Sequence, residues 1–213
     1  MTTPLPYDFL RALLVRRLDA TTSQWLDRAA TERGIDELAA AYTAVGRHVG
    51  RAPLALTAEE HSNVGDLHLD RWTLEDAARA VLVMTRFNLP AAIACYERGD
   101  SSEQQSWLKS VAVLPDPDQL LPVVIDACRT NILPLFEAIA CENPFPARHF
   151  PERNFNQMVL KALFNKVALA RIVGLPARRN ADLTRMAADY ASERRAAGRD
   201  VPPDIGLAMT ETP

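Results

Sequence analysis

The chain has 213 residues, of which 48% are hydrophobic and 24% charged, and its net charge is −3 at pH 7. This composition is typical of a folded globular protein and excludes a disordered or collagen-like chain. The acidic balance argues against a general nucleic-acid binder, and no apolar run approaches the roughly 20 residues of a membrane-spanning helix. No basic segment precedes the first apolar stretch, so we expect no secretory signal.

Apolar residues recur with helical spacing along the chain, and no segment alternates as a strand does. The sequence therefore predicts an all-α protein. The predicted helices span residues 5–18, 22–33, 35–48, 58–68, 73–87, 89–98, 102–114, 118–130, 132–142, 154–165, 168–173 and 181–197.

Residues that commonly begin helices support these boundaries. Segments 57–60, 73–76 and 102–105 resemble capping boxes, in which a hydroxyl accepts from an early backbone N–H and a side chain three residues later bonds back. Pro90 and Pro134 fall in predicted first turns, where the missing proline N–H has no intrahelical partner to lose.

From residue 73 onward the predicted helices form antiparallel pairs over residues 73–98, 102–130 and 132–165. Each pair is about 30 residues long, near the period of helical-hairpin repeats, which favours a HEAT-like, α-solenoid-like stack. No low-complexity linker divides the chain, so we expect a single domain over residues 1–200. A flexible tail is expected at residues 201–213.

The three cysteines, Cys95, Cys128 and Cys141, stand among Ala, Ile and Val. They are too few for a disulfide framework and resemble small core residues. We therefore predict buried thiols in a reducing compartment, the cytoplasm.

The densest run of polar and turn-forming residues lies between 127 and 164. A sharp turn is predicted at 141–146 and a connector at 147–153, followed by a helix whose core face holds Phe155, Met158, Val159, Ala162 and Leu163, with Leu160 and Phe164 widening the apolar arc. Lys161 lies on the opposite, narrow polar stripe. We expect Lys161 either to have a structural role, snorkelling to water or pairing with Glu142, or to contact a ligand.

Two segments carry a family resemblance. The run Cys-Glu-Asn-Pro-Phe-Pro-Ala at 141–147 and the run Phe-Asn-Gln-Met-Val-Leu-Lys-Ala-Leu-Phe at 155–164 resemble the signature of the EboA-domain family. Further residues that fit the same pattern lie at 129–131, 172–175, 189–190, 193–194 and 197–199. The resemblance implies a small bacterial protein of metabolite traffic, encoded beside a prenyltransferase, a barrel-type hydrolase and a sugar-phosphate cyclase. It supplies no catalytic residues to carry over.

The favoured hypothesis is a non-catalytic helical scaffold, without cofactor or metal, that binds or helps to traffic a small metabolite. The resemblance makes a prenylated or cyclitol-derived metabolite the expected class. Polar residues near the ends of the predicted helices would line the ligand site: Arg129, Asn131, Glu142, Asn143, His149, Asn156, Gln157 and Lys161.

Two other functions remain open. The chain could be a pathway enzyme in which His149 is the general base, Lys161 holds developing negative charge and Glu142 orients one of them. It could instead be an adaptor that binds other pathway proteins. A concave pocket lined by the polar set would favour a ligand site, whereas helix capping by the same residues would favour a structural role.

Charge is distributed unevenly along the chain. Residues 148–213 hold 11 Lys and Arg against 7 Asp and Glu, whereas residues 1–147 hold 13 against 20. A solvated basic surface explains this most simply, and contact with an acidic ligand, a partner or a membrane surface is the alternative. The set His61, Asp66, His68 and Asp70 lies near a fraying helix end, where we expect surface residues and no metal site.

Overall fold

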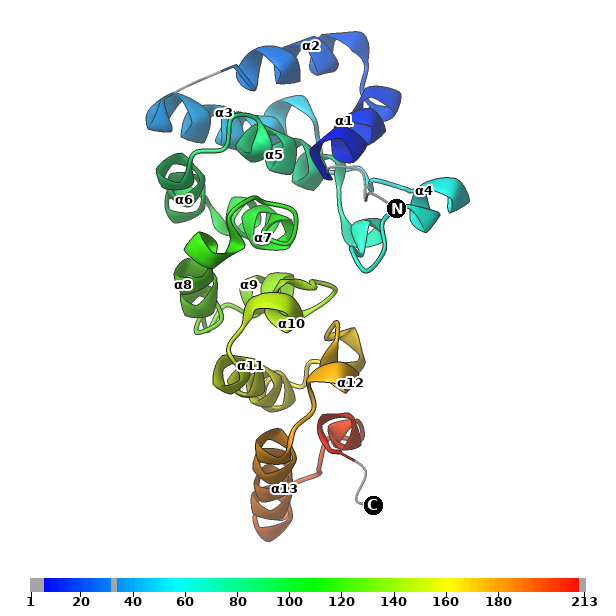
Figure 1. The fold of residues 1–213 in the computed structure, drawn as a ribbon, viewed down its shortest axis with the longest axis vertical. Coiled ribbons are helices and arrows are strands. Elements are labelled where there is room, and N and C mark those ends of the chain that lie inside the picture. Colours follow the sequence, from blue (N-terminus) through cyan, green and yellow to red (C-terminus); the bar gives the residue numbers. More distant parts are fainter. Residues whose placement is uncertain (1–5, 32–33, 211–213) are drawn as a thin grey trace. The chain divides into compact units, whose positions relative to one another are not determined.

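A computed structural model describes residues 6–31 and 34–210 of the chain. In these ranges the chain forms thirteen α-helices and three short 3-10 helices, and its only strand-like pairing is an isolated bridge between Pro53 and Thr73 (Figure 1). The all-α prediction is therefore confirmed. The predicted helical positions 5 and 32–33 lie outside the described residues.

The chain divides into two compact units, the first ending at Val123 and the second beginning at Val124. The elements up to this boundary are α1 (Pro6–Arg17), α2 (Ala20–Ala29), α3 (Ile35–His48), α4 (Ala58–Ser62), η1 (Leu69–Arg71), α5 (Leu74–Met84), α6 (Leu89–Arg98), α7 (Ser101–Ser110) and α8 (Pro117–Ala127), which spans it. The second unit contains α9 (Leu133–Ala140), α10 (Phe145–His149), α11 (Glu152–Phe164), η2 (Leu169–Arg171), α12 (Leu175–Arg178), α13 (Ala181–Ala196) and η3 (Ile205–Ala208).

Side-chain caps begin several of the helices. Capping boxes at 57–60 and 73–76 are both present, as predicted. The third prediction, at 102–105, is wrong: Asp100 caps α7, accepting from the backbone N–H groups of Ser102 and Glu103 at 2.8 and 2.9 Å. The Asp100 carboxylate accepts from two free N–H groups, so α7 begins before the predicted serine cap.

The predicted helix 58–68 is shorter than expected. Its α-helical part, α4, ends at Ser62, and Gly65 adopts a left-handed φ of +59° three residues later. Glycine reaches this conformation without the steric cost that other residues meet. A turn and η1 therefore replace the second half of the predicted helix.

α5 is the central helix of the first unit, packing against α1, α3 and α7. Its charged residues Glu75, Asp76 and Arg79 are only 2–3% exposed. Asp76 accepts hydrogen bonds from Ser106 at 2.6 Å and Lys109 at 2.8 Å, and Arg79 donates to the Ser106 hydroxyl at 3.0 Å and pairs with Glu75 at 3.3 Å. The contacts of Asp76 and Arg79 with Ser106 and Lys109 join α5 to α7 and offset the cost of burying these two charges.

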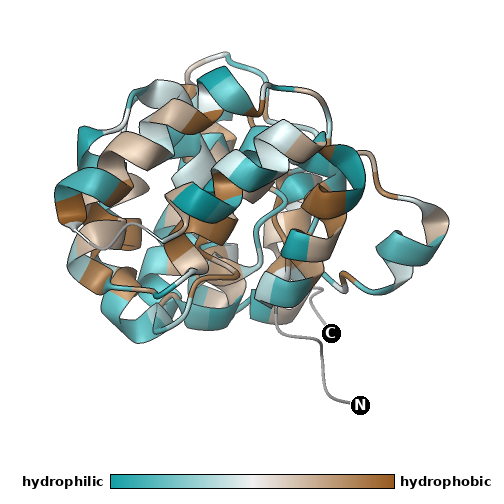
Figure 2. Cartoon of the chain, turned by 90° about the horizontal axis from the view of Figure 1, so that it is seen from above, coloured by the Kyte–Doolittle hydropathy of each residue, from teal (hydrophilic) through white to brown (hydrophobic). Residues whose placement is uncertain are grey.

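α11 is the central helix of the second unit, packing against α9, α13 and η2. Its predicted core face is confirmed, because all five of its members are buried: Phe155, Met158, Val159, Ala162 and Leu163. Phe164 differs from the expectation, with 61% of its surface exposed. Figure 2 shows hydrophobic and hydrophilic residues mixed along most helices, as expected where one face of each is buried.

The connector predicted at 147–153 is mostly helical. α10 begins at Phe145, with Pro146 in its first turn, and α11 begins at Glu152, two residues earlier than predicted. The side chain of Asn143 explains the extra helix, since its Oδ1 accepts from the Phe145 N–H at 3.0 Å. An Asn that bonds a backbone N–H two residues later starts a turn that a following proline can continue as helix.

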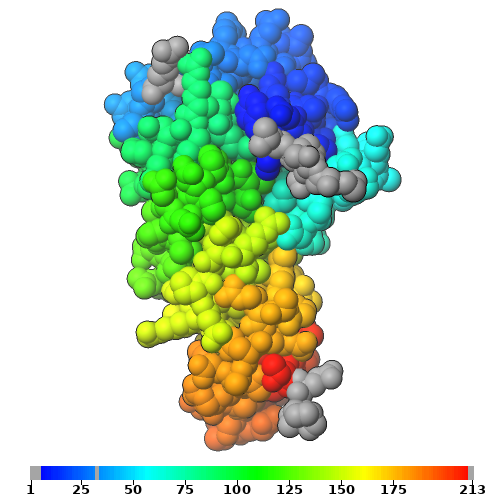
Figure 3. Space-filling view, in the orientation of Figure 1, coloured from blue at the N-terminus to red at the C-terminus, as the bar shows by residue number. Residues whose placement is uncertain are grey.

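The expected flexible tail begins at residue 201. In the structure, residues 201–210 run into η3, which packs against α12, α13 and η2. Ala208 of η3 is fully buried, and Figure 3 shows the red atoms of this segment beside the orange atoms of the helices that precede it. Residues 211–213 lie outside the described residues.

Asp76 makes the stability of the first unit depend on pH. Burial disfavours its ionised form, but Lys109, Ser106 and the Thr73 N–H outweigh burial and hold the pKa of Asp76 below its ordinary value of 3.8. A carboxyl with a depressed pKa stabilises the fold above its unfolded pKa, and this contribution is lost as the pH falls through the folded value. Asp76→Asn should lower the free energy of unfolding by about 1.5–3 kcal/mol at pH 7.

Denaturant unfolding at pH 7 and pH 3 tests this prediction. The difference in the free energy of unfolding between Asp76→Asn and the wild type should be smaller at pH 3. Asp36→Asn is the control, because Asp36 pairs with Arg98 while its side chain is 85% exposed. Its loss should stay below about 1 kcal/mol. Equal losses in the two variants would contradict the role assigned to Asp76.

Two phenylalanines of α11 provide a matched pair for the core of the second unit. Phe155 is fully buried, and the guanidinium of Arg178 lies 4.6 Å from its ring centroid, whereas Phe164 is 61% exposed. Phe155→Ala should cost about 3–5 kcal/mol through lost packing, and Phe164→Ala should cost less than about 1 kcal/mol. Thermal melts of both variants measure the difference, and similar losses would show that the buried face of α11 is assigned wrongly.

Candidate functional site

Three of the predicted site residues are engaged in holding the second unit together. Glu142 forms a bidentate ion pair with Arg171, at 2.8 and 3.0 Å. Asn143 bonds the backbone on both sides of its turn, and Asn156 exchanges two 3.1 Å hydrogen bonds with Asn180, which also caps α13. These side chains satisfy backbone groups and one another, as buried polar groups must.

Lys161 does not pair with Glu142, and that expectation is wrong. Its ammonium donates to the carbonyl oxygens of Cys128 at 2.7 Å and Thr130 at 2.6 Å, and it lies 5.1 Å from the centroid of the Phe136 ring. Burial lowers the pKa of Lys161. The two carbonyls follow the end of α8, where helix carbonyls lack intrahelical partners and cations are favoured.

A small cavity of about 110 Å³ adjoins this lysine. Three predicted site residues, Arg129, Gln157 and Lys161, contribute to its lining. Asn131 is exposed and does not line it, and neither does His149, whose ring packs 4.7 Å from that of Phe145. The cavity is smaller than the roughly 300–1,000 Å³ typical of ligand pockets, so the polar set does not form a metabolite site of ordinary size.

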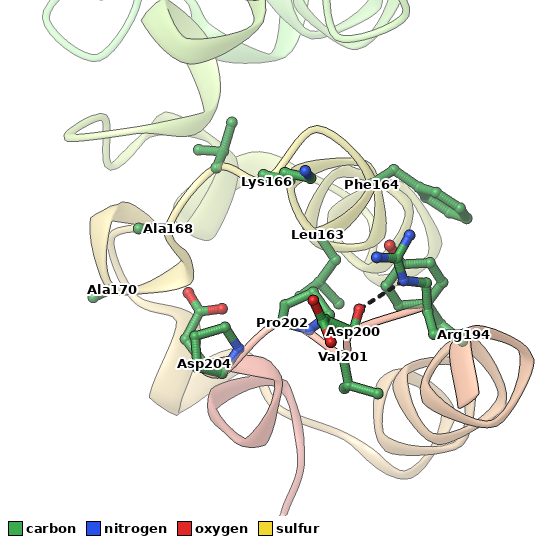
Figure 4. Close-up of a pocket in the computed structure, with 13 residues that line it drawn as sticks. Leu163, Phe164, Lys166, Ala168, Ala170, Arg194, Asp200, Val201, Pro202 and Asp204 are labelled. Atoms are coloured by element: carbon green, nitrogen blue, oxygen red, sulfur yellow. Dashed lines mark hydrogen bonds between the residues drawn. The ribbon is translucent and has the colours of Figure 1, made fainter. Parts of the chain in front are cut away.

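A larger concave feature of the second unit is a groove of about 540 Å³, which we call the α11–α13 groove (Figure 4). Side chains at the end of α11, in the segment after it, on α13 and in the segment before η3 line it together. They are Leu163, Phe164, Lys166, Val167, Ala168, Ala170, Tyr190, Arg194, Asp200, Val201, Pro202, Pro203 and Asp204.

The walls of this groove are mostly apolar. Phe164 and Tyr190 have ring centroids 4.5 Å apart, with Phe164 exposed and Tyr190 buried. Two cations and two carboxylates stand among them, so the lining has no net charge. Arg194 donates from Nε to the carbonyl oxygen of Asp200 at 2.8 Å, the contact dashed in Figure 4, and the carboxylate of Asp204 accepts from the Leu169 N–H at 2.6 Å.

Sequence reasoning missed this groove. The one available signal was Phe164, whose extra apolar surface at the end of the predicted helix exceeded what one core face needs. The other lining residues come from segments without a recognisable motif or from the expected tail. Only folding brings residues 163–170 beside residues 190–204.

Two of the three groups considered for acid–base chemistry are bound to structural partners. Glu142 is bound to Arg171, while Lys161 is bound to backbone carbonyls. Burial raises the pKa of each thiol, Cys95, Cys128 and Cys141, to about 12, so the predicted buried cysteines are unreactive near neutral pH. No group of three or more His, Cys, Asp or Glu side chains within residues 6–31 and 34–210 is arranged to hold a metal ion.

Comparison with known proteins gives one match. The model of a family described as metabolite traffic protein EboA matches residues 7–210, nearly the whole chain. No curated protein and no solved structure matches the chain. None of the helices in the part of the chain that the structure describes is long and apolar enough to cross a membrane.

Replacing Lys161 tests its structural role. Lys161→Met keeps the apolar stem but removes two charge-assisted hydrogen bonds, so the free energy of unfolding should fall by about 1.5–3 kcal/mol. Lys166→Met is the matched control, because Lys166 is exposed and its side chain makes no hydrogen bond or ion pair with any described residue. Denaturant unfolding of both variants measures the difference, and an unchanged Lys161→Met stability would return this lysine to the candidate ligand contacts.

Proposed function

Because the chain belongs to the EboA family, whose model is described as a metabolite traffic protein, we propose that it is a non-catalytic carrier with its ligand site in the α11–α13 groove. The metabolite would bind there reversibly and leave unchanged. The family description supports traffic as the role, and the groove supports a small molecule as the cargo.

The observation that carries this proposal is the volume of the groove together with its apolar lining. A volume of about 540 Å³ lies within the range of sites that enclose small organic ligands. Phe164 keeps 61% of its surface exposed beside the buried ring of Tyr190. A ligand that covers this aromatic surface gains roughly 25 cal/mol for each Å² of apolar area removed from water.

The lining also favours one class of metabolite over another. A cyclitol carries hydroxyl groups around its ring, and each needs a hydrogen-bond partner when it leaves water. The groove offers mainly aliphatic and aromatic walls, with charges from Lys166, Arg194, Asp200 and Asp204. These walls fit a prenylated or otherwise apolar metabolite better than a bare cyclitol. The proposed carrier would serve a bacterial biosynthetic pathway in the cytoplasm.

The acid–base alternative receives no support from the geometry. A general base and an electrostatic partner must converge on one reacting atom. Lys161 and Glu142 instead bind separate structural partners, the carbonyls of Cys128 and Thr130 in one case and Arg171 in the other. Carriage without chemistry is the function we propose.

For the architecture we propose a HEAT-like stack of helix pairs within a single domain. Packing between α9 and α11 supports the pair at 132–165. In the first unit the main packing partners of α6 are α3 and α7, and not α5, with which it was expected to form the pair at 73–98. A single cooperative unfolding transition seen by calorimetry would support one domain, and two separated transitions would argue for two.

The carrier proposal predicts which variant loses the metabolite. The wild-type protein, purified from its native host, should retain a small molecule detectable by mass spectrometry after denaturation. Phe164→Asp places a charge on the apolar wall and should reduce retention at least about tenfold, equivalent to 1.4 kcal/mol, with an unchanged melting temperature. The control is Val15→Asp, an exposed apolar residue outside the groove with 54% of its surface exposed.

Equal retention by Phe164→Asp and wild type would remove the groove as the ligand site. A wild-type protein that carries no small molecule under conditions where the pathway is active would overturn the carrier proposal.

A further inference from the structure

One wall of the α11–α13 groove is a single short segment of chain. Residues 200–204, which we call the arch, supply five consecutive lining residues, whereas the other lining residues come from the ends of α11 and α13 and from the segment after α11. Figure 4 shows Asp200, Val201, Pro202 and Asp204 along one side of the groove, opposite Lys166. The arch therefore forms that side of the groove.

The arch has few attachments to the other walls of the groove. Among the described residues, two hydrogen bonds hold it to those walls, from Arg194 Nε to the Asp200 carbonyl and from the Leu169 N–H to the Asp204 carboxylate. Two backbone hydrogen bonds, from the N–H groups of Ile205 and Leu207 to the carbonyls of Pro202 and Asp204, join its far end to η3. None of its five residues is buried. Segments with few buried side chains and few hydrogen bonds are those that open at low free energy.

The opposite walls cannot move at similar cost. Leu163 on α11 is 1% exposed and Tyr190 on α13 is 7% exposed, and the two helices pack against each other. Displacing either helix would expose core side chains and leave cavities. A ligand that enters or leaves this groove meets the least resistance at the arch.

The two ends of the arch differ in a way that defines a direction of movement. Gly198, just before the arch, has a left-handed φ of +62° and no neighbouring atom within 4 Å of the position of a Cβ. Beyond the arch, η3 is fixed by its packing against α12, α13 and η2 and by the buried Ala208. Pro202 and Pro203 restrict the backbone between these ends, so the arch moves as a stiff piece.

We propose that the arch is the gate of the α11–α13 groove, swinging outward between its two ends, Gly198 and the docked η3, so that ligand enters and leaves through this side. This rests on the proposed function, because a gate has a role only if the groove carries a ligand. Asp204 is the latch residue, since its carboxylate holds the Leu169 N–H.

Opening of the gate can be measured without any ligand. Amide hydrogen exchange of Leu169 reports the latch directly, because its N–H is the donor to Asp204. We expect its protection to be at least about 100-fold lower than that of the buried α11 residues Met158 and Val159. Asp204→Ala should raise the exchange rate of Leu169 about fivefold or more, the effect of one lost hydrogen bond on an opening equilibrium.

The matched control for the latch is Asp189→Ala. Asp189 lies on the exposed face of α13, with 68% of its side chain accessible, and pairs with Arg185 at 3.8 Å. This variant should leave Leu169 exchange unchanged. Protection of Leu169 equal to that of the α11 core, or equal exchange in the Asp204→Ala and wild-type proteins, would overturn the gate.

Binding kinetics distinguish a gate from a fixed wall. The probe is 1-anilinonaphthalene-8-sulfonate, an apolar fluorophore of suitable size, followed by stopped flow. A gate must open for passage in both directions, so Asp204→Ala should raise both the association rate and the dissociation rate several-fold. Because Asp204 also lines the groove, the rise in both rates, and not the value of Kd, identifies the gate. A rise in the dissociation rate alone would indicate a fixed wall and overturn the proposal.

The two proposals fail in different ways. A probe that binds Phe164→Asp as tightly as wild type is not in the groove, which counts against the proposed ligand site, while Leu169 exchange still decides whether the arch opens. If the probe no longer binds Phe164→Asp but binds and leaves Asp204→Ala at wild-type rates, the result supports the ligand site and contradicts the gate.

Discussion

Burial of one face of α11 is the constraint on which the second unit depends. Its apolar residues recur every three or four positions, so they face one side and require cover from α9, α13 and η2. Successive helical residues point about 100° apart, and turning Leu163 inward therefore turns Phe164 outward. The groove forms where this helix ends, because Leu163 supplies its floor and Phe164 its exposed edge.

The polar residues around α11 have a different role from the one that their density suggests. The second unit contains short helices and sharp turns, and each helix end leaves backbone groups without partners. Long or branched polar side chains supply those partners: Lys161 bonds two carbonyls after α8, and Arg178 bonds the carbonyls of Ala147 and Phe150 at 2.5 and 2.7 Å. A cluster of polar residues beside many helix ends therefore indicates backbone satisfaction as readily as a ligand site.

A carrier and an enzyme make opposite demands on a site. An enzyme needs titratable groups whose positions and pKa values are matched to one reacting atom. A carrier needs favourable apolar contact and a route for release, and strong directional chemistry would hinder release. The second set of demands is the one that the proposed function places on the α11–α13 groove, with Phe164 and Tyr190 for apolar contact and the arch as the wall proposed to open.

The sequence by itself determined the helical class, two of the three capping boxes, the buried face of α11 and the burial of the three cysteines. These features depend on side chains a few positions apart or on apolar neighbours, so periodicity and cap chemistry are enough to reveal them. The resemblance at 141–147 and 155–164 likewise identified the family, which the match over residues 7–210 confirms.

Only the tertiary structure decided the partners of Glu142 and Lys161 and the place of the groove. Arg171 competes for Glu142 from 29 residues away, and the carbonyl of Thr130 reaches Lys161 from 31 residues away. Such choices depend on which helix ends meet after packing, and local pattern carries no record of them. The groove is the extreme case, because its walls combine residues 163–170 with 190–204, and no pattern in either segment shows that the two will face each other.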